Sequence, residues 1–210
     1  MNKDAPVRIR YATPDDAAAL LAIYGPYVMD TTITFECVIP SVQDYAKHIS
    51  KLSAAYPFLA AECGGTLIGY AYASRYRERH AYTPSVLTSI YIAPDAQRKR
   101  LGKALYHCLL LLLKAQGYSV AFAAITIPNP PSAALHASMG FTPAGLFRKV
   151  GYKLGAWHDV MWMEKELAER IGPPKEPKAV CEIDPGFVES RFAEAEKRIR
   201  LSSISGDSHM

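Results

Sequence analysis

A strand, a basic loop, a helix and a second strand follow one another between residues 86 and 127, and this unit constrains the fold most. Val86–Ile92 is a β-branched run, and Ser119–Ile127 is again strand-like. Between them, Leu101–Gln116 has the Leu-rich pattern of a helix that Gly117 closes. Two strands connected through a helix lie parallel when the crossover is right-handed, as nearly all are. The unit therefore predicts a parallel strand pair at the centre of a mixed α/β fold.

The loop of this unit, residues 97–104, reads Gln-Arg-Lys-Arg-Leu-Gly-Lys-Ala. Unpaired N–H groups at a helix start and the helix dipole both favour an anion, and four basic side chains strengthen that preference. The loop lacks the spacing of a P-loop and the Gly-x-Gly-x-x-Gly turn of dinucleotide-binding folds, which disfavours an ATPase or a Rossmann dehydrogenase. The prediction is a phosphorylated ligand; a merely solvated basic face is the alternative.

Strands and helices are also predicted on either side of this unit. Thr13 and Ser41 are candidate N-caps of helices, and the pair Gly64-Gly65 predicts a tight hairpin turn. The predicted strands are Val7–Ala12, Phe58–Cys63, Thr66–Ser74, Phe141–Gly145 and His158–Lys165, and the predicted helices are Thr13 to about Tyr24, Val42–Ala54 and Ser132–Met139.

The last forty residues differ from the rest in proline content and in apolar pattern, which suggests a division into a domain over 1–170 and an appendage over 171–210. Four prolines between Ile171 and Pro185 predict a linker. Apolar residues then recur at helical spacing, at Val188, Phe192, Ala195 and Ile199. They predict an amphipathic helix that packs on the domain or on a second subunit.

Composition excludes several classes of protein. The longest strongly apolar run, around Leu109–Leu113, is far shorter than the ~20 residues of a membrane span, and Met1–Arg10 lacks a signal-peptide core. A net charge of +4 on 210 residues is too small to indicate a nucleic-acid partner. We expect a cytoplasmic protein with neither a metal site nor a disulfide framework, because no Cys-x-x-Cys pair occurs among Cys37, Cys63, Cys108 and Cys181.

Two motifs in residues 7–167 resemble the GNAT superfamily of acetyl-coenzyme A-dependent N-acetyltransferases. The family's cofactor loop is Gln/Arg-x-x-Gly-x-Gly/Ala; Gln97 and Gly102 match it, whereas Arg100 replaces the first glycine. The second motif runs from Asn129 to Phe141. The resemblance implies a mostly antiparallel sheet with a splayed parallel strand pair and flanking helices, and acetyl-coenzyme A as co-substrate. The residues that it implies for cofactor binding are Ser89, Ile90, Tyr91, Ile92, Gln97, Arg98, Lys99, Arg100, Gly102, Lys103, Ala104, Asn129 and Ser132.

Within the superfamily the chain looks most like the phosphinothricin acetyltransferase group, which includes enzymes acting on methionine sulfone and methionine sulfoximine. Four strings carry this likeness: Thr32–Phe35, Arg79–Tyr82, Leu135-His136 and Gly151–Val160. The resemblance implies that His136 assists proton transfer, since a histidine has a pKa near that of a useful base at neutral pH. It also implies a homodimer, a small amine as acceptor, and an acceptor site formed by Phe35, Arg77, Arg79 and Tyr82.

One position departs from the group. Leu87 stands where the group has a glutamate thought to activate the amine. Either His136 acts alone, directly or through water, or Glu78 or His80 substitutes, or catalysis is weakened. A competing hypothesis is therefore a cofactor-binding sensor or interaction module that uses its C-terminal helix. An acetyltransferase for another amine is a third.

Overall fold

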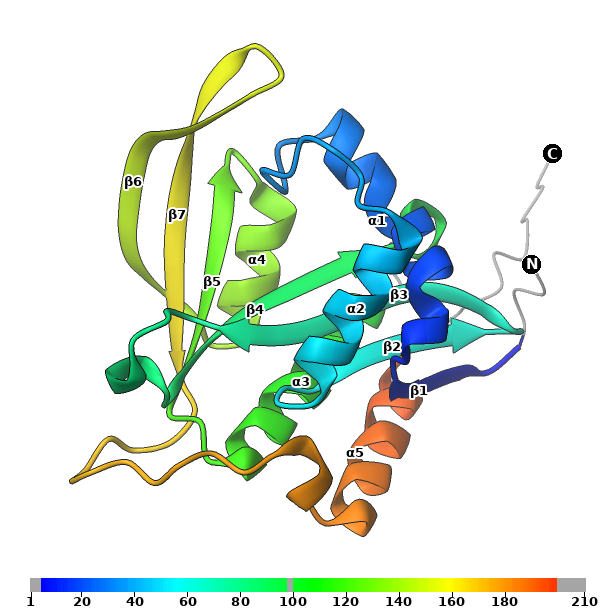
Figure 1. Ribbon diagram of the computed structural model, residues 1–210, viewed down its shortest axis with the longest axis vertical. Coiled ribbons are helices and arrows are strands. Elements are labelled where there is room, and N and C mark those ends of the chain that lie inside the picture. The colour runs from blue at the N-terminus through cyan, green and yellow to red at the C-terminus, as the bar shows by residue number, and fades with distance from the viewer. Residues whose placement is uncertain (1–4, 98–99, 200–210) are drawn as a thin grey trace, which may run out of the picture.

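The computed structural model describes residues 5–97 and 100–199, and its centre is a seven-stranded sheet (Figure 1). The strand order is β1-β2-β3-β4-β5-β7-β6; β4 and β5 run parallel, and the other neighbours pair antiparallel. This confirms the predicted fold class. The strands are β1 Val7–Tyr11, β2 Phe58–Cys63, β3 Thr66–Arg75, β4 Ser85–Ile92, β5 Val120–Ile127, β6 Thr142–Lys153 and β7 Ala156–Glu166.

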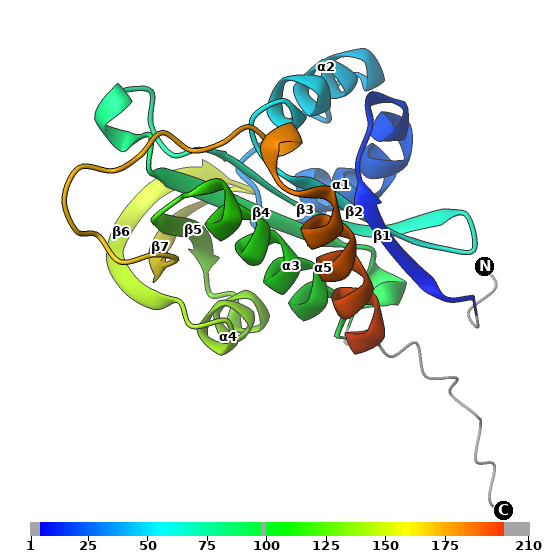
Figure 2. The ribbon, with the colours of Figure 1, turned by 90° about the horizontal axis from the view of Figure 1, so that it is seen from below.

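Helices cover both faces of the sheet (Figure 2). One hydrophobic core lies beneath α1 and α2, and a second and larger core lies beneath α3 and α5. The α-helices are α1 Ala17–Asp30, α2 Val42–Ser53, α3 Leu101–Gln116, α4 Pro130–Ser138 and α5 Pro185–Arg198. Short 3₁₀ turns are η1 Pro14–Asp16, η2 His80–Tyr82, η3 Pro94–Ala96 and η4 Val180–Glu182. Each described helix is too short or too polar to cross a membrane.

The parallel pair is splayed. Its pairing runs from Ser85 opposite Val120 to Leu87 opposite Phe122 and then stops, although both strands continue for five more residues. β4 remains paired with β3 along its other edge up to Ile92. The edge of β4 that faces β5 therefore has backbone groups without sheet partners from Thr88 onward, and a gap opens in the middle of the sheet.

Several boundaries differ from the sequence expectations, and three of these differences have a clear physical cause. α1 continues through Pro26 to Asp30, because the buried Val28 and the contact between the Tyr27 and Tyr91 rings offset the missing hydrogen bond of the proline. α4 begins at Pro130, where a proline needs no N–H partner. β6 extends eight residues past Gly145, because bulges absorb its irregular pattern.

The helix predicted in the last forty residues is present as α5, and its apolar side packs on α3 and β1 of the same chain. Val188 and Ala195 are buried, and the ring of Phe192 meets that of Tyr11 edge-on at 5.3 Å. The backbone N–H of Ile9 donates to Glu196 Oε1 at 2.7 Å. The segment therefore adds to the main core.

Candidate functional site

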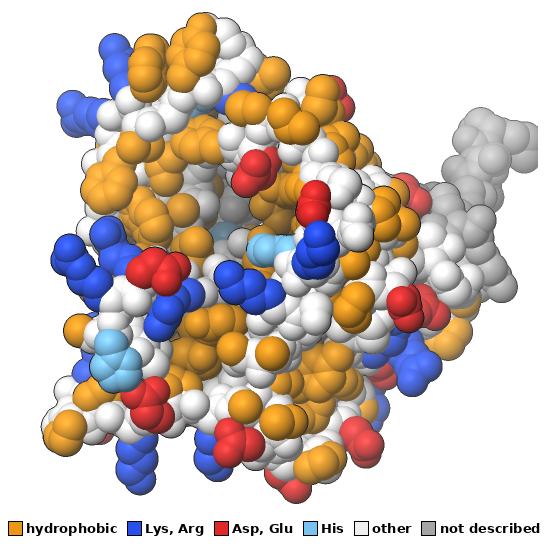
Figure 3. Space-filling model, viewed as in Figure 1, with side chains coloured by type: hydrophobic (Ala, Val, Ile, Leu, Met, Phe, Trp, Pro, Cys, Tyr) orange, Lys and Arg blue, Asp and Glu red, His pale blue; other side chains and the backbone are white. Residues whose placement is uncertain are grey.

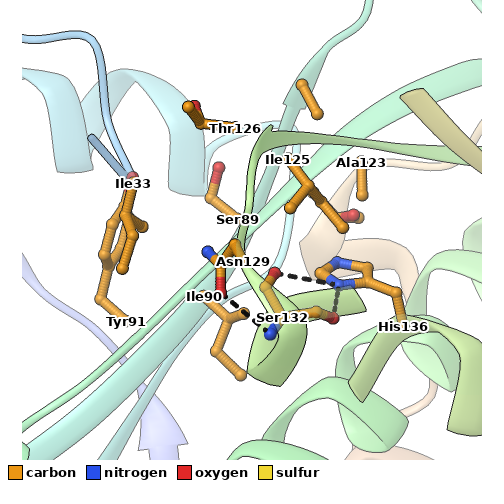
Figure 4. Close-up of a pocket in the computed structure, with 12 residues that line it drawn as sticks. Ile33, Ser89, Ile90, Tyr91, Ala123, Ile125, Thr126, Asn129, Ser132 and His136 are labelled. Carbon is orange, nitrogen blue, oxygen red and sulfur yellow. Dashed lines mark hydrogen bonds between the residues drawn. The ribbon is translucent and has the colours of Figure 1, made fainter. Parts of the chain in front are cut away.

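A narrow cavity of about 60 Å³ lies where β4 and β5 separate (Figure 4). Ser89 and Tyr91 line it from one face of β4, and Thr88 and Ile90 from the opposite face. Since residues from both faces contribute, the cavity passes between the strands, and we call it the cleft. Its lining is completed by Ile33, Ala123, Ala124, Ile125, Thr126, Asn129, Ser132 and His136. Ile92, also predicted at this site, is not part of the lining; its carbonyl accepts a hydrogen bond from Tyr27 Oη at 2.6 Å.

The basic loop meets the cleft at the start of α3. Arg100 is the N-cap residue and has a left-handed backbone, with φ 62° and ψ 1°. In the first turn, the N–H groups of Leu101, Gly102 and Lys103 have no partner within the helix, whereas the N–H of Ala104 donates to the carbonyl of Arg100 at 3.0 Å. A Cβ on Gly102 would lie 3.7 Å from both Ile90 and Leu135, so the glycine leaves a hollow of methyl-group size beside β4. Gln97 donates to Tyr27 Oη at 3.2 Å, and the predicted Arg98 and Lys99 lie outside the described residues.

Two residues of the α4 segment face the cleft from the other side. Asn129 caps α4, since its Oδ1 accepts from the N–H of Ser132 at 3.2 Å, which leaves its Nδ2 amide as the group able to donate to a ligand. Ser132 contributes a hydroxyl that lines the same cavity. Together with the free edge of β4 and the start of α3, these donors suit a long polar ligand with phosphates at one end, as coenzyme A has.

His136 is buried at the bottom of the cleft, where Figure 4 shows it beside Ser132 and below Ile125. Its Nδ1 lies 2.8 Å from the carbonyl oxygen of Ser132. Burial lowers the pKa of His136, and the hydrogen bond to that carbonyl offsets part of the shift. A histidine with a lowered pKa is neutral at pH 7 and is ready to take up a proton.

Sequence reasoning missed two buried hydroxyl groups next to His136. Tyr106 Oη of α3 lies 2.9 Å from His136 Nε2, and Thr88 Oγ1 of β4 lies 2.5 Å from Tyr106 Oη. The signal was present in the sequence. Thr88 alternates with the apolar Val86 and Ile90, and Tyr106 follows Gly102 by one helical turn, so both are polar residues on core-facing positions.

A larger cavity of about 400 Å³ adjoins the cleft and shares Ile33, Ala124 and Thr126 with it. Figure 3 shows hydrophobic side chains around the hollow on this side of the molecule. Phe35, predicted to contact the acceptor, lines this cavity, which we call the acceptor cavity. Its remaining lining is Phe147, Val150, Val160 and Trp162.

The other predicted acceptor residues lie on the loop between β3 and β4 and line neither cavity. The guanidinium of Arg77 lies over the rings of Tyr76 and Tyr82, 5.2 and 5.7 Å from their centroids. Tyr76 in turn stacks on Phe122 at 4.3 Å and meets Trp162 edge-on. Arg77 is thus connected through Tyr76 to the wall of the acceptor cavity. Arg79 caps the 3₁₀ turn that holds Tyr82 and is exposed.

The string Gly151–Val160 forms the turn of the β6–β7 hairpin and has clear structural roles. Asp159 Oδ1 accepts from the backbone N–H of Lys149 at 2.7 Å within a β6 bulge. The buried Lys153 donates to the carbonyl of Thr34 at 2.7 Å, which fastens the segment before Phe35 to β6. These residues shape the wall of the acceptor cavity.

The structure also locates Leu87 and the two residues proposed to replace a carboxylate at that position, Glu78 and His80. Leu87 is half-buried on β4 opposite Ser74 and Phe122. Glu78 pairs with Arg75 and is 93% exposed, and His80 is 85% exposed beside Glu176. Glu78 and His80 line neither the cleft nor the acceptor cavity, whereas His136 lies in the cleft.

Several known proteins are similar to this chain in sequence and in fold. The chain matches the family described as acetyltransferase (GNAT) domain over residues 9–162. It is 37% identical over 178 residues to the phosphinothricin N-acetyltransferase of Streptomyces viridochromogenes, covering 85% of this chain and 97% of that protein. It is 31% identical over 166 residues to the L-methionine sulfoximine/L-methionine sulfone acetyltransferase of Salmonella typhimurium, covering 79% of this chain and 97% of that protein.

A solved structure that contains acetyl-coenzyme A is also similar to this chain. The phosphinothricin acetyltransferase of Sinorhizobium meliloti, in complex with acetyl-coenzyme A, superposes with a TM-score of 0.77 at 34% identity, over 86% of this chain and 96% of that chain. The resemblance inferred from the two motifs is confirmed. The chain belongs to the GNAT family of N-acetyltransferases and uses acetyl-coenzyme A as its co-substrate.

Proposed function

We propose that this acetyltransferase acetylates the amine of a small amino-acid-like acceptor of the phosphinothricin, methionine sulfone or methionine sulfoximine type, and that His136 assists proton transfer. The continuity of the two cavities carries the proposal. The cleft that holds His136 opens beside Ile33 and Thr126 into the acceptor cavity lined by Phe35. An acceptor whose aliphatic part fills the larger cavity extends its amine into the cleft. The names of the relatives support the same acceptor class.

Each part of the site has a role in this reaction. Acetyl-coenzyme A supplies the thioester that a neutral amine attacks. Backbone N–H groups on the free edge of β4 beyond Thr88 polarise the thioester carbonyl, because fixed dipoles in a dry site stabilise the developing oxyanion. His136 takes up the proton that the amine must lose. Arg77 and Arg79, on the loop between β3 and β4 outside both cavities, have guanidinium groups that suit a carboxylate or a phosphinate only if that loop moves toward the acceptor.

The test is release of coenzyme A thiol from acetyl-coenzyme A with phosphinothricin, methionine sulfone and methionine sulfoximine as acceptors. His136→Ala is expected to lower kcat by about 10²-fold, the usual contribution of a positioned base. His107→Ala is the matched control, since His107 of α3 lies outside both cavities. Wild-type turnover by His136→Ala refutes the role of His136, and the absence of turnover with every amine of a broad panel refutes the acceptor class.

Leu87→Glu tests the weakened-module alternative in the same assay. A large rise in kcat indicates a reaction that has decayed, whereas an unchanged or lower kcat indicates that the described site works without a carboxylate at position 87. Calorimetric binding of acetyl-coenzyme A without turnover would favour a sensor. The apolar residues of α5, which that alternative assigned to a partner, pack on the same chain.

We further propose that two copies associate through the β6–β7 hairpin. Several large apolar and aromatic side chains are exposed along it, as is usual at an interaction surface; Phe147 and Val150 among them also line the acceptor cavity: Leu146, Phe147, Val150, Tyr152, Leu154 and Trp157. Trp157→Asp should convert a dimer into a monomer in light scattering. A monomeric wild-type chain at micromolar concentration refutes this assembly.

A further inference from the structure

Both ring nitrogens of His136 already have partners, which restricts how it can receive a proton. A carbonyl oxygen only accepts, so the contact with Ser132 O at 2.8 Å requires that Nδ1 carries a proton. In the neutral imidazole, Nε2 is then the basic nitrogen. Its lone pair points to Tyr106 Oη, 2.9 Å away, and not to the open cleft. A proton that reaches Nε2 therefore comes through Tyr106.

Tyr106 is one member of a chain of hydroxyl groups that ends at the splay point of the sheet. Its Oη lies 2.5 Å from Thr88 Oγ1, and Thr88 Oγ1 lies 2.8 Å from the carbonyl of Phe122. Tyr106 and Thr88 are 0% and 5% exposed. The Tyr106 ring is held by Phe141, which stacks on it at 5.7 Å, and by the edge-on ring of His136.

This chain has two hydrogen arrangements, one for each state of His136. When His136 is neutral, Thr88 donates to Tyr106 and Tyr106 donates to Nε2, and in that state the hydrogen bond from Thr88 Oγ1 to the Phe122 carbonyl is given up. When His136 is protonated, Nε2 donates to Tyr106, Tyr106 donates to Thr88, and Thr88 donates to the Phe122 carbonyl. Because Phe122 O accepts the last hydrogen, each donor keeps an acceptor after the reversal.

Resting on the proposed acetyl transfer, we propose that Thr88 and Tyr106 form a proton relay from the cleft to His136. The amine N–H bond breaks as Thr88 Oγ1 gains the proton, the Thr88 proton passes to Tyr106 Oη, and the Tyr106 proton passes to His136 Nε2. Both hydroxyl groups end neutral, and the one positive charge rests on the imidazolium. The reverse movement returns the proton to the departing thiolate.

Thr88 is the entry point for geometric reasons. It lines the cleft, whereas Tyr106 does not, and it is the first β4 residue beyond the last pair with β5. The groups that face His136 are Tyr106 of α3, Phe141 before β6 and Ser132 of α4, and each is uncharged. The relay thus supplies a path for the proton, which the neighbouring residue Leu87 cannot accept.

Tyr106→Phe is the direct test, since it keeps the ring packing and removes the hydroxyl. We expect a loss of about 10²-fold in kcat with KM for both substrates changed less than twofold, and loss of the ascending limb of the pH profile of kcat. Tyr70→Phe is the matched control, because Tyr70 is equally buried, is bonded at 3.0 Å to Tyr45 and lies outside both cavities.

Position 88 gives a second test if the tyrosine variant fails to fold. Thr88→Val should lose kcat as Tyr106→Phe does, and Thr88→Ser, which keeps the hydroxyl, should retain it within a few-fold. Wild-type kcat and pH profile in Thr88→Val or Tyr106→Phe overturn the relay. If His136→Ala still loses activity in that case, the proposed function stands without the relay; wild-type activity in all three variants refutes both.

Discussion

Replacing Arg100 by glycine should change stability and cofactor affinity in opposite directions. Arg100 has a φ of 62°, in the left-handed region where a side chain costs roughly 1–2 kcal/mol. Glycine removes that strain, but its greater conformational entropy in the unfolded chain destabilises the folded state by roughly 0.5–1 kcal/mol. The variant is therefore more stable by up to about 1.5 kcal/mol, which raises Tm by up to about 6 °C in a chain of this size.

The same change removes a guanidinium at the start of α3, where the phosphates of coenzyme A are expected. Because the side chain is exposed, we expect a loss of about tenfold in affinity, at the low end for a charge-assisted contact. The loss should shrink with added salt, since salt screens exposed charges. Differential scanning fluorimetry measures Tm, and titration calorimetry measures the Kd of coenzyme A at two salt concentrations.

Two variants make the result decisive. Lys149→Gly relieves a similar left-handed conformation, with φ 49°, in the β6 bulge, so it should raise Tm without changing the Kd of coenzyme A. Arg100→Lys keeps the charge and the strain. If Arg100→Gly binds coenzyme A as tightly as the wild type, the side chain does not serve the phosphates. If its Tm falls, the strain argument is wrong.

Three further predictions concern the acceptor cavity, pH and α5. Gly151→Ala should raise KM for the acceptor about tenfold but not KM for acetyl-coenzyme A, because the new Cβ would lie 2.2 Å from a ring carbon of Phe35; Gly145→Ala, with open space around it, is the steady-state control. Asp16→Asn should lose about 1–2 kcal/mol of unfolding free energy at pH 7. Hydrogen bonds from Arg10 to the Asp16 carboxylate lower the pKa of Asp16. The stabilisation from this contact is therefore present at pH values above the ordinary pKa of an aspartate and is lost as the pH falls through the lowered pKa, so urea unfolding at pH 7 and pH 3 measures the change. Ala195→Asp should cost more than about 3 kcal/mol in urea unfolding because it buries a carboxylate in the α5 contact; the exposed Ser190→Asp should unfold like the wild type, and an equal loss in that variant would contradict the reasoning.

Local signals were sufficient for most of the fold. Gly117 ends α3 with a φ of 100°, as its position after a Leu-rich run predicted, and Ser41 accepts from the N–H of Asp44 at 3.1 Å as a helix cap. The Gly64-Gly65 turn has both φ angles positive, as a two-residue hairpin needs. Each feature depends on a few neighbouring residues, so the sequence displays it directly.

The site was less predictable because its contacts join distant elements. Asn129 was predicted from a motif and lines the cleft, but its cap bond to Ser132 was not foreseen. Arg77 was grouped with Phe35, although the structure holds it over Tyr76, outside the cavity that Phe35 lines. The pairing of Thr88 with Tyr106 depends on how α3 lies across the splayed strands, and no local pattern contains that information.

The alternation of β4 explains why the loss of a carboxylate at one position need not disable this site. Leu87 and Thr88 are adjacent, so their side chains point to opposite faces of the sheet. The gap beyond the last β4–β5 pair joins those faces, and both the cleft lining and the hydroxyl chain meet there. A proton released in the gap is therefore within reach of the face that holds Thr88, Tyr106 and His136. On this reasoning Leu87→Glu adds a second acceptor on the opposite face, and its effect on kcat should be largest when the relay is broken by Tyr106→Phe.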